Sequence, residues 1–235
     1  MTDSTSGTIA IIGALDEEVA LIAAALDDVT HDHAASLDVV RGTIATNKGE
    51  RLAVVATVGG MGLVAAAATT QHLISTYRPD AVIFSGIAGN LNRELHINDV
   101  VLGGTLRYLD SDMRLIAQSA PKTEEFHSDP HLIELADEAL DEMGITHITG
   151  IIATGNYFVE GDENVNRVIV ATGADAVEME GAAVVHVAAR NEVPALVIRA
   201  LSDNADTEYE TFKDFDISEY ADTAAKLVVN ILGRM

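Results

Sequence analysis

Short apolar runs rich in valine, isoleucine and alanine alternate along the chain with longer segments in which apolar residues recur at helical spacing. The short runs predict strands at residues 8–13, 37–46, 51–58, 80–86, 99–109, 146–155, 175–180 and 194–203. The longer segments predict helices at 16–28, 130–143, 163–173, 181–191 and 217–232, and an alanine-rich helix that ends near residue 77. His31 and His33 fall between these elements, in what we interpret as a polar loop.

Strands that alternate with helices predict an α/β fold built on a central sheet that is parallel in large part. Residues 37–46 and 51–58 are the exception, because they flank a short polar segment and predict an antiparallel hairpin. We therefore expect a mixed sheet flanked by helices in a three-layer arrangement. With 235 residues and 48% hydrophobic content the chain is long enough for a full core, and we expect one domain over 8–235 after a disordered tail at 1–7.

The segment from Leu52 to Tyr77 contains no Asp, Glu, Lys or Arg and is long enough to imitate a membrane-spanning helix. Glycines at 59, 60 and 62 divide it into a strand rich in β-branched residues and an alanine-rich helix. We therefore interpret it as a strand, a turn and a buried helix, and we expect no membrane partner.

Acidic residues dominate the charge, since 37 Asp and Glu face 14 Lys and Arg and give a formal net charge of −23. Such a field repels nucleic acids and anionic membranes, so neither is an expected partner. The chain has no cysteine, which excludes disulfides and thiolate metal sites. The N-terminus carries no basic segment followed by an apolar core, so we expect no signal peptide and a cytoplasmic location.

Candidate chemistry gathers where strands end, because ligands of open α/β sheets bind beyond the carboxyl ends of the strands. Polar or glycine-rich clusters lie at 13–18, 57–62, 85–90, 178–181 and 202–206. Three of these clusters carry carboxylates and none carries Lys or Arg. This composition suits a polyol ligand and proton transfer better than a phosphate.

Residues 197–206, VIRALSDNAD, place charge inside an apolar strand. Side chains alternate along a strand, so Arg199, Leu201 and Asp203 are expected on one face. Buried charge is costly unless it is paired or used, which makes Arg199 and Asp203 candidate site residues.

The glycine turn permits a second interpretation, because Gly60, Gly62 and Ala65 match the spacing of a dinucleotide-binding fingerprint. That motif needs an acid at the end of the following strand to bind the ribose, and Asp80 begins that strand instead. The chain also lacks zinc-hydrolase, serine-hydrolase and P-loop motifs, and its histidines lack ligand spacing. We therefore expect neither a cofactor nor a metal.

Six segments of the chain are similar in sequence, order and interval to segments of the bacterial 5′-methylthioadenosine/S-adenosylhomocysteine nucleosidases. They read IIGALDEEV, GMGLVAAAA, SGIAGNL, TGNYFVEG, VEMEGAAV and RALSDNAD. The resemblance extends from Ile9 to about Leu232. It implies the fold of the purine nucleoside phosphorylase/hydrolase superfamily, a central mixed sheet of barrel character surrounded by helices, and it implies a homodimer.

The resemblance also implies cleavage of the N-glycosidic bond of an adenine nucleoside. Cleavage develops positive charge on the ribose and negative charge on the departing adenine, so a site must protonate the base and supply water to C1′. Asp203 matches the family's general acid, which protonates adenine N7 and contacts the 6-amino group. Glu18 matches the base that activates water. Asp206, in the same motif as Asp203, is interpreted as a loop acid or a cap.

Other positions match the family's substrate contacts. Glu180 corresponds to the carboxylate that binds the ribose hydroxyls, and Met179 to a residue that packs on the sugar. Phe158 would stack on the purine while the backbone of Val159 reads its edge. Arg199 resembles a structural partner that positions the acidic cluster. The remaining expected contacts are Gly59, Ala88 and Glu178.

Two departures from the family pattern bear on the substrate. The turn has Gly59 where the nucleosidases often have serine, so one hydroxyl near the nucleophile is missing. Residues 110–127 lack the Gly/Tyr/Pro-rich loop with which the family closes over the 5′-thio group. The substrate therefore stays open among methylthioadenosine, S-adenosylhomocysteine, 5′-deoxyadenosine and other adenosine derivatives.

Hydrolysis is favoured over phosphorolysis by the residues themselves. A phosphorylase must bind a phosphate dianion near C1′, which calls for arginine or a cluster of donors. The turn after the first strand instead carries Asp16, Glu17 and Glu18, and the glycine turn carries no basic residue. A phosphate-dependent purine nucleoside phosphorylase and a non-catalytic nucleoside-binding protein are the alternatives.

Overall fold

The computed structural model describes residues 6–205, 216 and 218–235. In this part of the chain nine strands form one sheet with the order β2-β3-β4-β1-β5-β8-β7-β6-β9. Their bounds are β1 Thr8–Gly13, β2 Asp27–Ala34, β3 Leu37–Ala45, β4 Arg51–Val58, β5 Ala81–Asn90, β6 Val100–Tyr108, β7 His147–Thr154, β8 Ala176–Glu178 and β9 Ala195–Asp203. The helices are α1 Asp16–Ala24, α2 Leu63–Tyr77, α3 Met113–Ile116, α4 Pro130–Met143, α5 Asp162–Thr172, α6 Gly181–Arg190 and α8 Ser218–Arg234.

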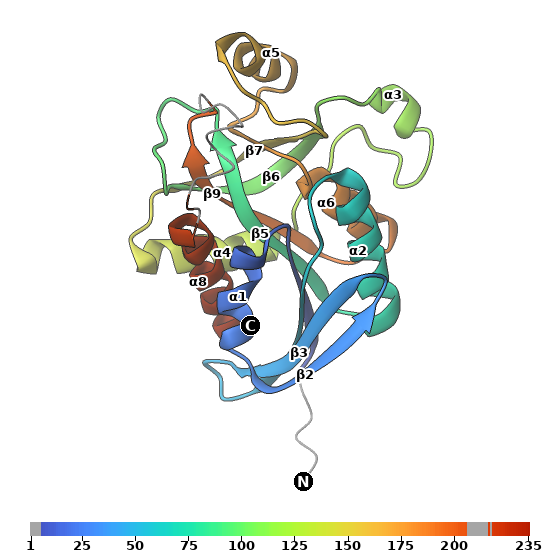
Figure 1. Ribbon diagram of the computed structural model, residues 1–235, viewed down its shortest axis with the longest axis vertical. Coiled ribbons are helices and arrows are strands. Elements are labelled where there is room, and N and C mark those ends of the chain that lie inside the picture. The colour runs from blue at the N-terminus through green and yellow to red at the C-terminus, as the bar shows by residue number, and fades with distance from the viewer. Residues whose placement is uncertain (1–5, 206–215, 217) are drawn as a thin grey trace.

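The sheet closes on itself over part of its width, because β5 pairs with β9 as well as with β1 and β8. Strands β5, β8, β7, β6 and β9 therefore form a small barrel, from which β1, β4, β3 and β2 extend as an open sheet (Figure 1). Strand β1 runs parallel to β4 and β5, whereas β2, β3 and β4 form an antiparallel meander. The predicted mixed, partly barrel-like α/β fold is confirmed.

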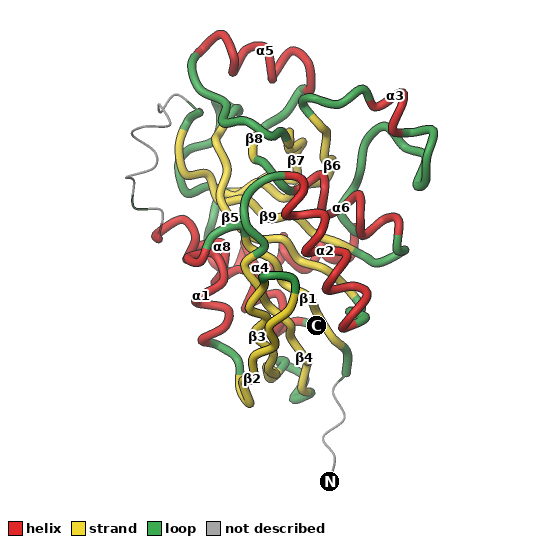
Figure 2. The backbone as a smooth tube through the Cα atoms, turned by 45° about the vertical axis from the view of Figure 1, so that its right-hand side comes forward, coloured by secondary structure: helices red, strands yellow, loops and turns green. Residues whose placement is uncertain are grey.

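Helices cover both faces of the sheet, as the tube in Figure 2 also shows. Helices α1, α4 and α8 pack together on one face, and α2 and α6 pack together on the other. Side chains of successive strand residues point to opposite faces of the sheet. Ile83 therefore packs in the apolar cluster beneath α8, and Phe84 packs in the cluster beneath α2 and α6. This alternation produces the expected three layers.

The uncharged segment at 52–77 forms β4, a glycine turn and α2, as interpreted from the sequence. Gly62 precedes α2 with a φ of +91°, a conformation that favours glycine. Among the described residues, none of the helices is long and apolar enough to cross a membrane.

The helix predicted at 16–28 is wrong at its C-terminal end, because α1 stops at Ala24 and β2 follows from Asp27. The polar loop assigned to His31 and His33 is wrong for the same reason, since both residues lie on β2. Within the described part of the chain this strand pairs on one side only, with β3, and most of its side chains are exposed. An edge strand that is exposed to solvent on both faces needs no alternation of apolar and polar residues, so its sequence does not indicate a strand.

Strand β5 continues to Asn90, beyond the end predicted at residue 86. Residues 85–90, which were expected to follow this strand, are thus part of it. Ser6 and Gly7, in the expected tail, hydrogen-bond to Arg51 and Ala53 of β4. Residues 1–5 and Asp206 lie outside the described residues.

Candidate active site

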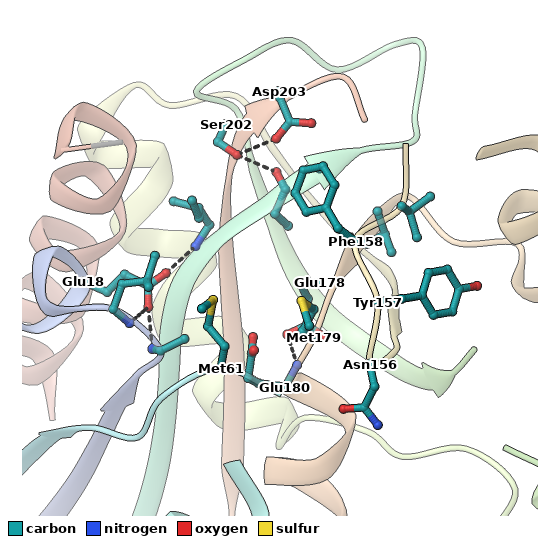
Figure 3. A pocket seen from close by; sticks show the side chains of 17 residues that line it. Glu18, Met61, Asn156, Tyr157, Phe158, Glu178, Met179, Glu180, Ser202 and Asp203 are labelled. Carbon is teal, nitrogen blue, oxygen red and sulfur yellow. Dashed lines mark hydrogen bonds between the residues drawn. The ribbon is translucent and has the colours of Figure 1, made fainter. Parts of the chain in front are cut away.

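A cavity of about 410 Å³ lies where β5, β8 and β9 end (Figure 3). The expected site residues that line it are Glu18, Ala88, Phe158, Val159, Glu178, Met179, Glu180 and Asp203. Residues outside the expected set also contribute, among them Leu15, Met61, Ile87, Asn156, Tyr157 and Ser202. The chain therefore brings segments from six separate regions of the sequence around one cavity.

Glu18 lies in the first turn of α1 with only 3% of its surface exposed. Its Oε2 accepts hydrogen bonds from the backbone N–H groups of Ala14 (2.5 Å) and Leu15 (3.0 Å), and its Oε1 accepts one from Ile87 (3.1 Å). Burial raises the pKa of Glu18, against the opposing effects of Arg199 and these N–H groups. A carboxylate with a raised pKa takes up a proton closer to neutral pH, which suits a general base.

Arg199 is 1% exposed and does not line the cavity. Its Nη2 forms an ion pair with Glu178 and lies 3.9 Å from Oε2 of Glu180. Its guanidinium also lies over the ring of Phe84, 4.1 Å from the centroid. The contacts place a buried cation beside two carboxylates, whose negative charge it offsets.

Glu178 ends β8, and both of its carboxylate oxygens accept hydrogen bonds from the protein. Oε1 accepts from the hydroxyl of Thr154, and Oε2 accepts from the backbone N–H groups of Glu180 (3.0 Å) and Gly181 (2.7 Å). These N–H groups open α6, where unpaired donors and the helix dipole favour negative charge. Glu178 therefore fixes the start of the helix that presents Glu180 to the cavity.

Glu180 connects that helix to the glycine turn, because its Oε1 accepts a hydrogen bond from the N–H of Gly62 at 2.7 Å. Burial and, to a smaller extent, nearby Glu178 raise the pKa of Glu180 to about 7, while Arg199 opposes the shift. The carboxyl group of Glu180 therefore titrates near neutral pH.

Strand β9 contains a β-bulge immediately before Asp203. Its register against β5 shifts between Ala88 and Gly89, which leaves Ser202 as the extra residue. The prediction that strict alternation places Arg199 and Asp203 on one face is therefore wrong, since a bulge re-aims the residues that follow it.

Hydrogen bonds fix the carboxyl group of Asp203 at the cavity. Its Oδ2 accepts from the hydroxyl of Ser202 at 2.8 Å, and its Oδ1 accepts from the N–H of Ala205 at 2.7 Å. The Ser202 hydroxyl also lies 3.4 Å from the carbonyl oxygen of Ala88 on β5. Figure 3 shows this group at the end of β9.

The loop between β7 and α5 supplies an apolar wall made of Tyr157, Phe158 and Val159. Asn156 anchors this loop, because its Oδ1 accepts a hydrogen bond from the N–H of Leu63 at 3.0 Å. The sequence analysis did not single out Asn156, although it lies inside the TGNYFVEG segment that carries the family resemblance.

Gly59 was expected to contact the substrate, but it does not line the cavity. Its N–H donates to the carbonyl oxygen of Gly13 at 2.8 Å. A Cβ atom at this position would lie 3.1 Å from the hydroxyl oxygen of Thr69 and 3.2 Å from a methyl carbon of Ile12. Gly59 therefore packs the turn closely against α2 and β1.

Comparison with known proteins places the chain in a family. The sequence profile of the phosphorylase superfamily matches residues 8–233. A 5′-methylthioadenosine/S-adenosylhomocysteine nucleosidase from Shewanella sp. (strain W3-18-1) is 38% identical over 215 residues, which cover 88% of this chain and 90% of that protein. The chain belongs to the 5′-methylthioadenosine/S-adenosylhomocysteine nucleosidase family. The resemblance stated from the sequence is thereby confirmed.

Solved structures show the same likeness for this nucleosidase family member. The S-adenosylhomocysteine nucleosidase of Streptococcus pyogenes in complex with 5-methylthiotubericidin has a TM-score of 0.90 at 29% identity, covering 99% of this chain and 98% of that one. The futalosine hydrolase of Helicobacter pylori has a TM-score of 0.86 at 29% identity, covering 97% and 98%. Relatives with this fold are thus named for different nucleosides.

The raised pKa of Glu180 predicts a pH-dependent effect of Glu180→Gln on stability. Folded protein keeps a proton on this carboxyl up to about pH 7, whereas unfolded protein loses it near the ordinary value of 4.5. Between pH 5 and pH 8 the free energy of unfolding of wild-type protein should therefore fall by about 1 to 3 kcal/mol relative to that of the variant. Urea denaturation at each pH measures this difference. The exposed control Glu163→Gln should show no such trend, and a wild-type advantage that grows with pH would contradict the assignment.

Proposed function

We propose that this chain hydrolyses the N-glycosidic bond of 5′-methylthioadenosine, S-adenosylhomocysteine or a related 5′-substituted adenosine, releasing adenine and a 5′-thioribose. The observation that carries the proposal is the presence of two buried carboxyl groups, Glu18 and Asp203, on one cavity of a nucleosidase-family chain. The reaction needs a proton donor at the purine and an activated water at C1′. Two separate carboxyl groups can divide these tasks.

Asp203 is proposed as the general acid. When protonated, its carboxyl group donates to adenine N7, and its second oxygen accepts a hydrogen bond from the 6-amino group. The hydrogen bonds from Ser202 and Ala205 hold the plane of the carboxyl group, which fixes the direction of proton transfer. Protonation of N7 makes adenine a better leaving group.

Glu18 is proposed as the base that takes a proton from the attacking water. Its raised pKa suits this role, and its three backbone hydrogen bonds hold the carboxylate in one position. The hydroxide equivalent adds to C1′ as the C1′–N9 bond breaks, and the proton from water stays on Glu18.

Glu180 and Met179 are proposed to bind the ribose, because a carboxylate accepts two hydroxyl hydrogen bonds and its charge stabilises the oxocarbenium ion. Glu178 and Arg199 support this contact through the start of α6. Phe158 is proposed to stack on adenine, with the backbone of Val159 and the wall at Ala88 beside it.

Water is proposed as the nucleophile in place of phosphate. Among the described residues, no Lys, Arg or His lines the cavity. Arg199 is engaged by Glu178 and carries little exposed surface. A phosphate dianion would therefore meet carboxylates without a cation to offset its charge.

We extend the proposal to a homodimer in the cytoplasm. The exposed residues Met61, Val64, Ala68 and Gln71 recur at helical spacing on and beside α2 and carry no charge. In a chain with net charge −23, such a neutral, partly apolar face is where a second copy meets the least repulsion.

The function is tested by incubating the purified chain with methylthioadenosine, S-adenosylhomocysteine, futalosine, adenosine and inosine, with and without phosphate. The free base and the sugar product are measured by chromatography. We expect adenine to be released from a 5′-substituted adenosine without phosphate. Strict dependence on phosphate with formation of a ribose 1-phosphate would overturn hydrolysis. Binding without turnover would favour a non-catalytic nucleoside-binding protein.

The two proposed catalytic residues are tested by Asp203→Asn and Glu18→Gln. Each variant removes a group that transfers a proton, so kcat should fall by about 10²-fold or more. The matched controls Asp16→Asn and Glu17→Gln change exposed acids in the same turn as Glu18 and should keep near-normal rates. A near-normal kcat in either test variant would remove that residue from its role.

A further inference from the structure

Gly86 lies on β5, next to Ile87, whose N–H donates to Glu18. It is buried and pairs in register with Arg199 of β9. A Cβ atom at residue 86 would lie 2.7 Å from Cδ of Glu18, and closer still to Oε1. The carboxylate of Glu18 thus occupies the space that any other side chain at this position would fill.

We infer that Gly86 is a positioning residue for the base of the proposed reaction, through the space it leaves for the Glu18 carboxylate. The inference rests on the proposed function, because it concerns the residue assigned there to water activation. Activation of water depends on the position of the base, and a misplacement of about 1 Å can cost about 10²-fold in rate.

An added methyl group at residue 86 meets only side-chain atoms among its three nearest neighbours. The atoms that it meets are the ends of two long side chains, the Glu18 carboxylate and Nη1 of Arg199 at 3.0 Å. The φ of Gly86 lies outside the left-handed region, so alanine fits its backbone conformation. Gly13 differs, since a Cβ atom there would meet the stem of Glu18 at 2.9 Å and Val19 at 2.8 Å.

The test is the kinetics of Gly86→Ala with the best substrate found for the wild-type chain. We expect kcat to fall by about 10-fold to 10²-fold while KM changes by less than about threefold, because the cavity walls that hold the nucleoside stay in place. The matched control is Gly104→Ala in β6. Its added methyl group would lie 2.7 Å from a methyl carbon of Thr149, and neither residue lines the cavity. It should keep kcat near the wild-type value.

A double-mutant cycle separates a positioning effect from general damage. In the Glu18→Gln background, Gly86→Ala should lower kcat by less than about threefold, because the base is already absent. A loss as large as in the wild-type background would overturn the inference, as would a near-normal kcat for Gly86→Ala alone. An inactive wild-type chain would instead defeat the proposed function.

Stability provides a second measurement, valid even where Gly86→Ala weakens the fold. In the Glu18→Ala background the space beside residue 86 is empty, so Gly86→Ala should shift the urea midpoint less than it does in wild-type protein. An equal shift in both backgrounds would show that the methyl group meets something other than Glu18, and would overturn the inference.

Discussion

The guanidinium of Arg199 lies almost fully buried between Glu178, Glu180 and the ring of Phe84. Carboxylates withdrawn from water are costly unless a cation or hydrogen-bond donors offset their charge. Arg199 supplies the cation, and it also opposes the rise that burial causes in the pKa values of Glu18 and Glu180. The site therefore keeps several acids in an apolar cavity without a basic residue in its described lining.

Backbone groups supply the rest of the stabilisation, and the topology brings them together. The N–H groups around Glu18 come from the turn after β1 and from β5, which are neighbours in the sheet. The N–H groups bound by Glu178 open α6, and Glu180 accepts from the glycine turn before α2. Closure of the barrel through the β5–β9 pair then brings Asp203 to the same cavity.

Much of this arrangement was predictable from sequence, because apolar periodicity marks buried strands and helices and the family motifs mark the acids. Strand β2 was not predictable, since its exposed edge position leaves no apolar alternation. The bulge at Ser202 was also hidden, because a register shift depends on the partner strand and not on the residue itself. Asn156 and Gly86 lay within recognised motifs, but only the three-dimensional contacts show what each touches.

Arg199 makes it possible to bury ionised carboxylates in this protein. The decisive measurement is the free energy of unfolding of Arg199→Met, compared with that of wild-type protein at pH 5 and pH 8. We expect the loss of stability to grow with pH and to reach about 3 to 5 kcal/mol at pH 8, because carboxylates left without a cation resist ionisation. An equal loss at both pH values would contradict the claim and assign the contribution of Arg199 to its packing on Phe84.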